Sequence, residues 1–379
     1  MACIVRSPRN QYGPLDRQNN FNLLRLLAAA QVVLMHGHAH LHLPTNPILF
    51  WVASQFSGVA CFFVISGFLV SDSYLRSSSA GSFFFKRALR IYPALLANIV
   101  ALEILMHFAG QSPGAINIGY PAYLLTYLST ASNDIAEFVT GISPYTYTGF
   151  FQSYPSQVLW TLTVELSFYF VLPFFLSIAY RWRMIGSALI AVAMAASFAI
   201  VFSVQDQFYE QHKLLNVFVA PYFWVFGLGV MARLYWDEIG FLFRRKLLLW
   251  LLAYGAVAAI TILYFGADNW LEYKLHPEWT GLFRIATMGC VVLSAAFSFK
   301  TLTAKLRLDD LDLSYGLYLW HMLVVMTLIG LGYTGSGWLW PVVFGGGLGL
   351  AALSWFGIEK RAEGWKRFAG RKKPIAQPG

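Results

Sequence analysis

Two residues that can do chemistry lie inside the first apolar stretch of the chain. Arg25 and His36 are eleven residues apart in the run 20–41. Eleven residues make three turns of an α-helix, a rise of about 16 Å, so both side chains lie on one helix face at two depths. An imidazole can act as a base near neutral pH, and a guanidinium binds carboxylates and phosphates. Because an ionisable group within an apolar span is costly, the pair indicates a functional site.

His36 also begins a run in which every second residue is a histidine, continuing with His38, His40 and His42. On a helix, His40 shares the face of His36, whereas His38 points away. Neither of the two H-x-x-x-H pairs has the intervening glutamate of H-E-x-x-H, so the pattern disfavours a metal site. We therefore expect His36 to be the reactive histidine, His40 to line the mouth where an acceptor binds, and no metal.

A carboxylate stands in the fourth apolar stretch, within the segment WTLTVELSFYFVLP. This residue, Glu165, has Thr161 and Tyr169 on its helix face. A carboxylate buried in a span without a partner is very costly, so another helix must supply one. His36 fits by depth, and we expect Glu165, or another buried acid, to orient the imidazole.

Other polar groups in the spans leave alternatives open. Glu103 and His107 are four residues apart on one helix face and can satisfy each other, while Glu103 can instead pair with an arginine such as Arg25. In the segment LSYGLYLWH, Tyr318 and His321 share one stripe with a serine. That stripe indicates either hydrogen bonds between helices or the lining of a cavity.

A basic element, FFFKRALRIYP, contains Lys86, Arg87 and Arg90. It is either a membrane anchor on the cytoplasmic side or a clamp for phosphate groups. Upstream, FFVISGFLVSD contains Ser66 and Gly67. Small residues at this place either allow two helices to pack closely or allow a ligand to approach the backbone.

The elements that position these residues are membrane helices. Of 379 residues, 58% are hydrophobic and only 12% are charged, about half the charged share of a soluble domain. Apolar runs near the ~20 residues needed to cross a bilayer recur along the whole chain. We predict an all-α polytopic membrane protein with about ten transmembrane helices, near 20–41, 47–75, 92–110, 156–180, 184–204, 214–235, 247–266, 279–299, 311–333 and 337–358. The segment 120–131 is too short to span and is expected in the interface.

The distribution of charge sets the predicted orientation. Of the 27 Lys and Arg residues, only Arg25, Lys213, Lys274 and Arg284 fall outside segments that face the cytoplasm when both termini are inside. The positive-inside rule supports this orientation. We expect a cytoplasmic tail at 1–19, a single transmembrane domain at 20–358 and a basic cytoplasmic tail at 359–379. Membrane topology and anionic lipid account for the net charge of +9, so no nucleic-acid partner is expected.

Taken in order, the motifs resemble the acyltransferase-3 family of integral-membrane O-acyltransferases. The resemblance covers most of the chain, and its individual motifs are weak while the ordered set is specific. It runs through Arg25-x10-His36, FFVISGFLV, KRALRIYP, WTLTVELSFY, SYGLYLWH and a closing Ile358-Glu359-Lys360. The chain departs from the family in its histidine-rich stretch after His36, and it carries no soluble esterase-like domain of the kind fused to some members.

The resemblance implies an enzyme of a bacterial cytoplasmic membrane that takes an acyl group, most often acetyl, from acetyl-CoA or another short acyl-CoA. It delivers the group to a hydroxyl on the outer side, commonly of an exopolysaccharide, an O-antigen or a lipid-linked oligosaccharide, while other members act on antibiotics or lipids. It implies that His36 is the essential histidine, that Arg25 is its paired arginine and that the basic R-x-x-R binds the donor. No oligomeric state is indicated.

We accordingly assign the candidate residues by role. Catalysis is assigned to His36 and Glu165. Donor binding is assigned to Arg25, Ser66, Lys86, Arg87 and Arg90. Acceptor binding is assigned to His40, Trp160, Tyr169, Tyr318 and His321.

His36 can act as the base for the acceptor hydroxyl or as a transient acyl carrier. The alternative function is a transporter or flippase of a glycan or lipid intermediate, in which buried Arg, His and Glu relay protons.

Overall fold

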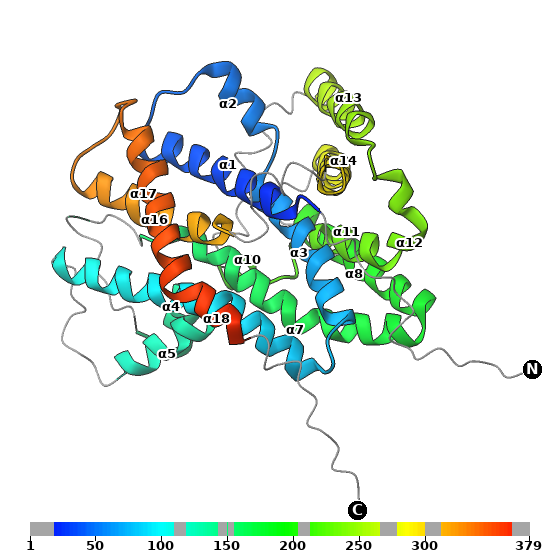
Figure 1. Ribbon diagram of the computed structural model, residues 1–379, viewed down its shortest axis with the longest axis horizontal. Coiled ribbons are helices and arrows are strands. Elements are labelled where there is room, and N and C mark those ends of the chain that lie inside the picture. The colour runs from blue at the N-terminus through cyan, green and yellow to red at the C-terminus, as the bar shows by residue number, and fades with distance from the viewer. Residues whose placement is uncertain are drawn as a thin grey trace, which may run out of the picture.

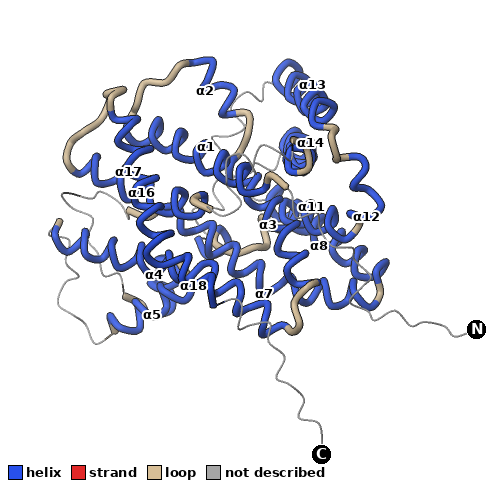
Figure 2. Tube along the Cα trace, viewed as in Figure 1, coloured by secondary structure: helices blue, strands red, loops and turns tan. Residues whose placement is uncertain are grey.

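The computed structural model describes residues 19–109, 119–142, 150, 155–203, 213–265, 279–299 and 312–365. Within these residues every regular element is helical (Figures 1 and 2). The predicted all-α fold is confirmed. The predicted tails and the basic segment 300–307 lie largely outside the described residues, so the domain boundaries and the cytoplasmic position of both termini stay predictions.

The span predicted at 47–75 is interrupted between Ser54 and Gly58, and the helix at the span predicted at 92–110 begins twelve residues earlier, at Ala80. Long helices overlap all of the predicted spans. They are α1 (Phe21–Leu41), α3 (Gly58–Leu75), α4 (Ala80–Phe108), α7 (Trp160–Arg181), α8 (Arg183–Ser203), α11 (Phe223–Leu234), α13 (Leu247–Phe265), α14 (Trp279–Ala296), α16 (Ser314–Gly330) and α17 (Leu339–Ser354). The shorter helices are α2 (Pro47–Ser54), α5 (Tyr120–Thr130), α6 (Asn133–Thr140), α10 (Lys213–Asn216), α12 (Trp236–Ile239) and α18 (Lys360–Trp365). Single turns η2 (Gln157–Leu159) and η3 (Gly240–Leu242) and a π-helical turn η4 (Trp355–Glu359) complete the described elements.

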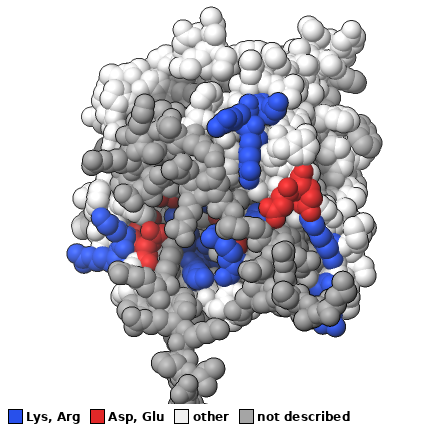
Figure 3. All heavy atoms as spheres, turned by 45° about the vertical axis from the view of Figure 1, so that its right-hand side comes forward, with Lys and Arg blue, Asp and Glu red and all other residues white. Residues whose placement is uncertain are grey.

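Six helical segments in the described part of the chain are long and apolar enough to cross a membrane. Helix α1 is not among them, because Arg25 and three histidines lower its hydropathy. Three further apolar helices, which include α11 and α16, are shorter. In Figure 3 the Lys, Arg, Asp and Glu side chains gather across the middle of the face, while its upper edge is free of them. A multi-pass membrane protein is therefore confirmed, and the number ten stays a prediction.

Helix α5 has 11 residues, which is too few to cross a membrane, as predicted. It packs against α4. The Tyr120 hydroxyl donates to Glu103 Oε2 over 2.7 Å, and the Tyr92 hydroxyl donates to the Ser129 carbonyl over 2.8 Å. Because Glu103 follows Tyr92 along α4 while Tyr120 precedes Ser129, α4 and α5 are antiparallel. Glu103 is thus bound by a tyrosine of α5.

Helices α3 and α11 approach each other through glycines. A β-carbon on Gly67 would overlap the carbonyl oxygen of Phe226, and one on Gly229 would lie 2.6 Å from the backbone nitrogen of Phe68. Little more than one turn further on, Arg233 Nε donates to Asp72 Oδ1 over 2.9 Å, and both side chains are 1% exposed. The packing interpretation of Gly67 is therefore correct, and the contact holds α3 in position beside the candidate site.

Helices α1 and α16 lie side by side and run in the same direction. Arg25 pairs with Asp312, just before α16, and eleven residues later His36 contacts His321, nine residues after Asp312. These separations are axial rises of about 16 and 14 Å, so the two helices stay in register over three turns. On the far side, α17 packs against α16, where a β-carbon on Gly316 would lie 2.8 Å from the Ala351 side chain.

Candidate functional site

Asp312 anchors two of the predicted donor-binding arginines at one end of the site. Its Oδ2 lies 3.7 Å from Arg25 Nη1 and 2.5 Å from Arg90 Nη2. Its Oδ1 accepts from the backbone nitrogen of Ser314 over 3.2 Å, which fixes the carboxylate at the start of α16. The side chain is only 8% exposed. The structural partner of Arg25 is thus Asp312 and not Glu103.

The sequence predictions missed Asp312, although a signal was present. An aspartate two residues before a serine at the start of an apolar run is a typical helix-starting pattern. In this chain the same carboxylate also faces two cations. Its pairing with Arg25 could not be derived from the sequence, because the two residues are 287 positions apart.

Arg87 is the arginine of this group that has no carboxylate within ion-pair distance among the described residues. Its Nη2 donates to Ser73 Oγ over 3.3 Å, and its guanidinium lies 5.9 Å from the ring centre of Tyr169. Its Nε is buried without a hydrogen-bond partner. Lys86 instead turns toward Ser77 Oγ, 3.4 Å away, and does not line the cavity described next.

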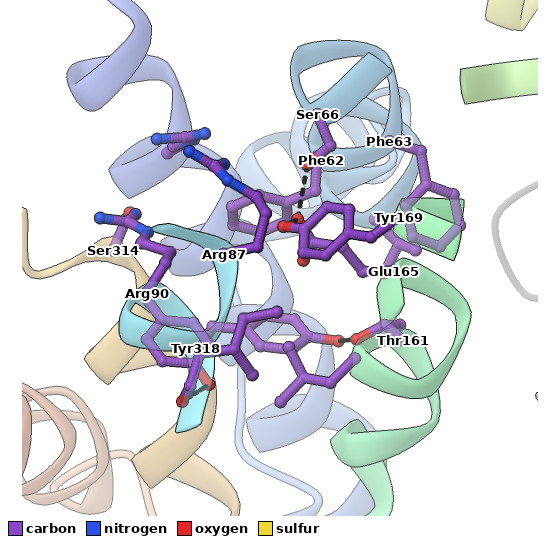
Figure 4. Close-up of a pocket in the computed structure, with 15 residues that line it drawn as sticks. Phe62, Phe63, Ser66, Arg87, Arg90, Thr161, Glu165, Tyr169, Ser314 and Tyr318 are labelled. Carbon is purple, nitrogen blue, oxygen red and sulfur yellow. Dashed lines mark hydrogen bonds between the residues drawn. The ribbon is translucent and has the colours of Figure 1, made fainter. Parts of the chain in front are cut away.

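A narrow cavity connects these groups. Its volume is about 60 Å³, enough for a few water molecules and well below the roughly 300–1,000 Å³ of pockets that hold organic ligands. Figure 4 shows Arg87 and Arg90 on one side, with Thr161 and Tyr318 at the opposite end. The lining comprises Arg25, Val59, Phe62, Phe63, Ser66, Arg87, Arg90, Ile91, Thr161, Leu162, Glu165, Tyr169, Ser314, Tyr315 and Tyr318.

Glu165 projects into the middle of this cavity from α7. Its Oε1 accepts hydrogen bonds from Ser66 Oγ, over 3.1 Å, and from the Tyr169 hydroxyl one turn along the same helix. The structure therefore gives Glu165 partners other than His36, with which it shares no hydrogen bond. A catalytic role for Glu165 stays a prediction.

The partner of His36 is His321. His36 Nδ1 lies 2.9 Å from His321 Nε2, and the rings are nearly parallel, 5.2 Å apart at an angle of 19°. His321 Nδ1 lies 3.1 Å from the Leu317 carbonyl oxygen of its own helix. His40 adds an edge contact, with its ring centre 5.5 Å from that of His36. The two histidines predicted for different roles therefore form one pair.

Tyr318 separates the histidine pair from the cavity. Its hydroxyl lies 2.7 Å from Thr161 Oγ1, which joins α16 to α7, and its ring is 5.4 Å from that of Phe62. On the other side its ring centre is 6.2 Å from that of His321. His36 and His321 do not line the cavity. Tyr318 therefore lies between the cavity and the histidine pair.

The remaining predicted residue, Trp160, lies in an aromatic cluster. Its ring centre is 5.4 Å from that of Tyr222 and 6.4 Å from that of Phe63, and it does not line the cavity. Among the residues that the structure describes, no group of three His, Cys, Asp or Glu side chains is arranged to hold a metal ion. The described site therefore has two parts: a cavity with three arginines, and a histidine pair beyond Tyr318.

Comparison with known proteins gives consistent matches. Residues 18–358 match the family model described as "Acyltransferase domain". Nodulation protein 10 of Rhizobium leguminosarum bv. viciae is 44% identical over 365 residues, which cover 94% of this chain and 95% of that protein. The BcsY protein of Komagataeibacter xylinus, a membrane-bound transacylase by name, is 28% identical over 329 residues, 82% of this chain and 74% of that protein.

A more distant relative is the peptidoglycan O-acetyltransferase OatA of Listeria monocytogenes. It is 24% identical over 330 residues, which are 80% of this chain and 48% of that protein. No solved structure matches the chain.

Proposed function

The chain belongs to the acyltransferase family whose model covers residues 18–358, and on that premise we propose that it moves an acyl group from a cytoplasmic acyl-CoA to a hydroxyl of a glycan outside the membrane. The chain is an acyltransferase of a multi-pass membrane type. We propose acetyl-CoA as the first candidate for the donor and a glycan hydroxyl as the acceptor. We also propose that the protein lies in a bacterial cytoplasmic membrane with both termini on the cytoplasmic side.

The observation that carries the proposal is the convergence of Arg25, Arg87 and Arg90 on one cavity that contains Glu165 and adjoins Asp312. Three guanidinium groups face two carboxylates, so the local charge favours an anion. Planar guanidinium groups bind phosphate with paired hydrogen bonds. CoA carries a pyrophosphate and a 3′-phosphate, and Arg87, which has no carboxylate partner among the described residues, is the first candidate to receive one.

The distance between the two parts of the site fits an extended donor. Arg25 and His36 are separated by about 16 Å of helix rise, and the thioester of an acyl-CoA lies at the far end of a long flexible arm. Phosphates held by the arginines would let the thioester reach His36 once Tyr318 moves aside. The cavity of about 60 Å³ is too small for this arm, so the proposal requires Tyr318 to move when the donor binds.

Two routes from this arrangement remain as proposals. In direct transfer, His36 takes the proton of the acceptor hydroxyl as that oxygen attacks the thioester carbon, and CoA leaves as the thiol. In the relay, His36 carries the acyl group between donor and acceptor. Mass spectrometry of protein incubated with acetyl-CoA alone separates them, because only the relay labels the peptide that contains His36.

The experiment that tests the function measures CoA release and acyl transfer by purified protein supplied with acetyl-CoA and glycan acceptor. We expect turnover in the wild type and a raised donor KM in Arg87→Lys, which keeps the charge but loses the planar fork. Arg181→Lys is the matched control, since Arg181 stacks on Trp182 outside the cavity. A transporter would release no CoA, and that outcome would refute the proposal.

A further inference from the structure

The hydrogen bonds around His321 determine which of its nitrogens carries a proton. His321 Nδ1 lies 3.1 Å from the Leu317 carbonyl oxygen, and a carbonyl oxygen only accepts. His321 Nδ1 is therefore the protonated nitrogen. A neutral imidazole has one N–H group, so in neutral His321 the other nitrogen, Nε2, is an acceptor.

Burial favours the neutral form of His321. Its side chain is 0% exposed, and no carboxylate of the described residues lies within ion-pair distance of it. A buried cation without a partner is costly. The neighbour that meets His321 Nε2 is another imidazole, His36, which adds no negative charge.

It follows that His36 is the donor in the pair. His321 Nε2 accepts, so the proton in the 2.9 Å contact belongs to His36 Nδ1. Neutral His36 then has its free lone pair on Nε2. The hydrogen bonds thus run in one direction, from His36 to His321 to the Leu317 carbonyl, and leave one nitrogen able to take a proton.

We propose that His321 is a positioning residue that fixes the tautomer of His36 and thereby makes His36 Nε2 the atom that accepts the proton of the acceptor hydroxyl. The inference rests on the proposed acyl transfer for the identity of the proton donor, but the tautomer itself does not. It changes the role predicted for His321 from acceptor binding to control of the catalytic imidazole.

The packing around His321 holds its ring in this orientation. Leu317 lies one turn earlier on the same helix, so the backbone of α16 itself fixes Nδ1. Helix α17 closes over the base of the ring, where a β-carbon on Gly347 would lie 3.5 Å from His321 Cβ. Groups that orient a reactive histidine from behind are effective when their own rotamers are fixed in this way.

The proton balance of the step is complete without a further reactant. The acceptor O–H bond breaks as its oxygen joins the acyl carbon, and a new N–H bond forms at His36 Nε2. The positive charge of the imidazolium is shared with His321 through the N–H···N bond. The proton then passes to the thiolate released from the donor, which leaves as the thiol, and both imidazoles are neutral again.

A pair of substitutions at His321 tests the role. His321→Gln can place an amide oxygen near the position of the accepting Nε2, whereas His321→Leu removes the acceptor. Losing one buried hydrogen-bond partner lowers rates by roughly 10- to 100-fold. We expect kcat to fall by this factor in His321→Leu with the donor KM within about two-fold, and to recover largely in His321→Gln. His107→Leu, in the last turn of α4 and outside the cavity lining, should change neither kcat nor the donor KM.

Nitrogen NMR of protein labelled with 15N-histidine tests the tautomer without requiring turnover. The His36 signals are assigned by their loss in His36→Gln. We expect protonated Nδ1 and unprotonated Nε2 in the wild type and in His40→Gln, and a mixture of tautomers in His321→Leu. A wild-type His36 protonated on Nε2 would overturn the inference. A correct tautomer in a protein that releases no CoA would instead refute the proposed function alone.

Discussion

The contact between α3 and α11 predicts that adding one methyl group at Gly67 destabilises the protein. A β-carbon there overlaps the Phe226 carbonyl oxygen and lies 2.9 Å from the Phe226 carbonyl carbon. Carbon atoms in contact prefer about 3.5–4.0 Å. The obstacle is backbone, which no side-chain rotation relieves, so Gly67→Ala forces the two helices apart by roughly 1 Å.

The size of the effect follows from two opposing contributions. Overpacking costs about 1–3 kcal/mol, with rigid backbone contacts at the upper end, while replacing glycine by alanine within a helix contributes about 1 kcal/mol in the other direction. The net loss is therefore roughly 2 kcal/mol. Separation of the helices also lengthens the buried Arg233–Asp72 contact, now 2.9 Å. Gly255→Ala is the matched control, because nothing lies within 4 Å of its β-carbon.

The difference in stability between Gly67→Ala and the wild type is measured by thermal unfolding in detergent. Unfolding is monitored by the reaction of Cys61 and Cys290 with a fluorogenic thiol reagent, in a Cys3→Ser background. Both thiols are partly buried in the folded protein. We expect a lower midpoint temperature for Gly67→Ala and an equal or higher one for Gly255→Ala. Equal midpoints for Gly67→Ala and the wild type would refute the close approach of α3 and α11.

Three further predictions concern the cavity. Asp312→Asn leaves Arg25 and Arg90 without their shared carboxylate, so we expect the free energy of unfolding to fall by up to about 3 kcal/mol. We also expect a changed donor KM, obtained from rates of CoA release. Tyr318→Phe removes the hydrogen bond to Thr161, and we expect a changed kcat with little change in midpoint temperature; an unaltered kcat would mean that this bond does not limit passage. Arg25→Lys retains charge but not the planar fork, so donor KM should rise at least several-fold, and unaltered kinetics would contradict paired phosphate recognition.

The side chains that share one face of a single helix could be predicted directly from the sequence. The placement of Arg25 and His36 on one helix needs only the 3.6-residue period, and α1 contains both. Glu165 with Thr161 and Tyr169 also follows from the helical period, and all three line the cavity. The need of Glu165 for a buried partner was predicted on energetic grounds. The partner predicted from depth was His36, whereas in the structure Ser66 and Tyr169 donate hydrogen bonds to Glu165.

The amino-acid sequence by itself determined that this protein is a multi-helical membrane acyltransferase, and which side chains share a helix face. Hydropathy and helical periodicity are local properties, and ordered motifs carry the family resemblance. Only the tertiary structure decided that His36 faces His321 and that Asp312 holds Arg25 and Arg90. The physical reason is that apolar helices in lipid have no strongly hydrophobic face to mark their neighbours. Glycine contacts and a few polar pairs, distant in sequence, select which faces meet.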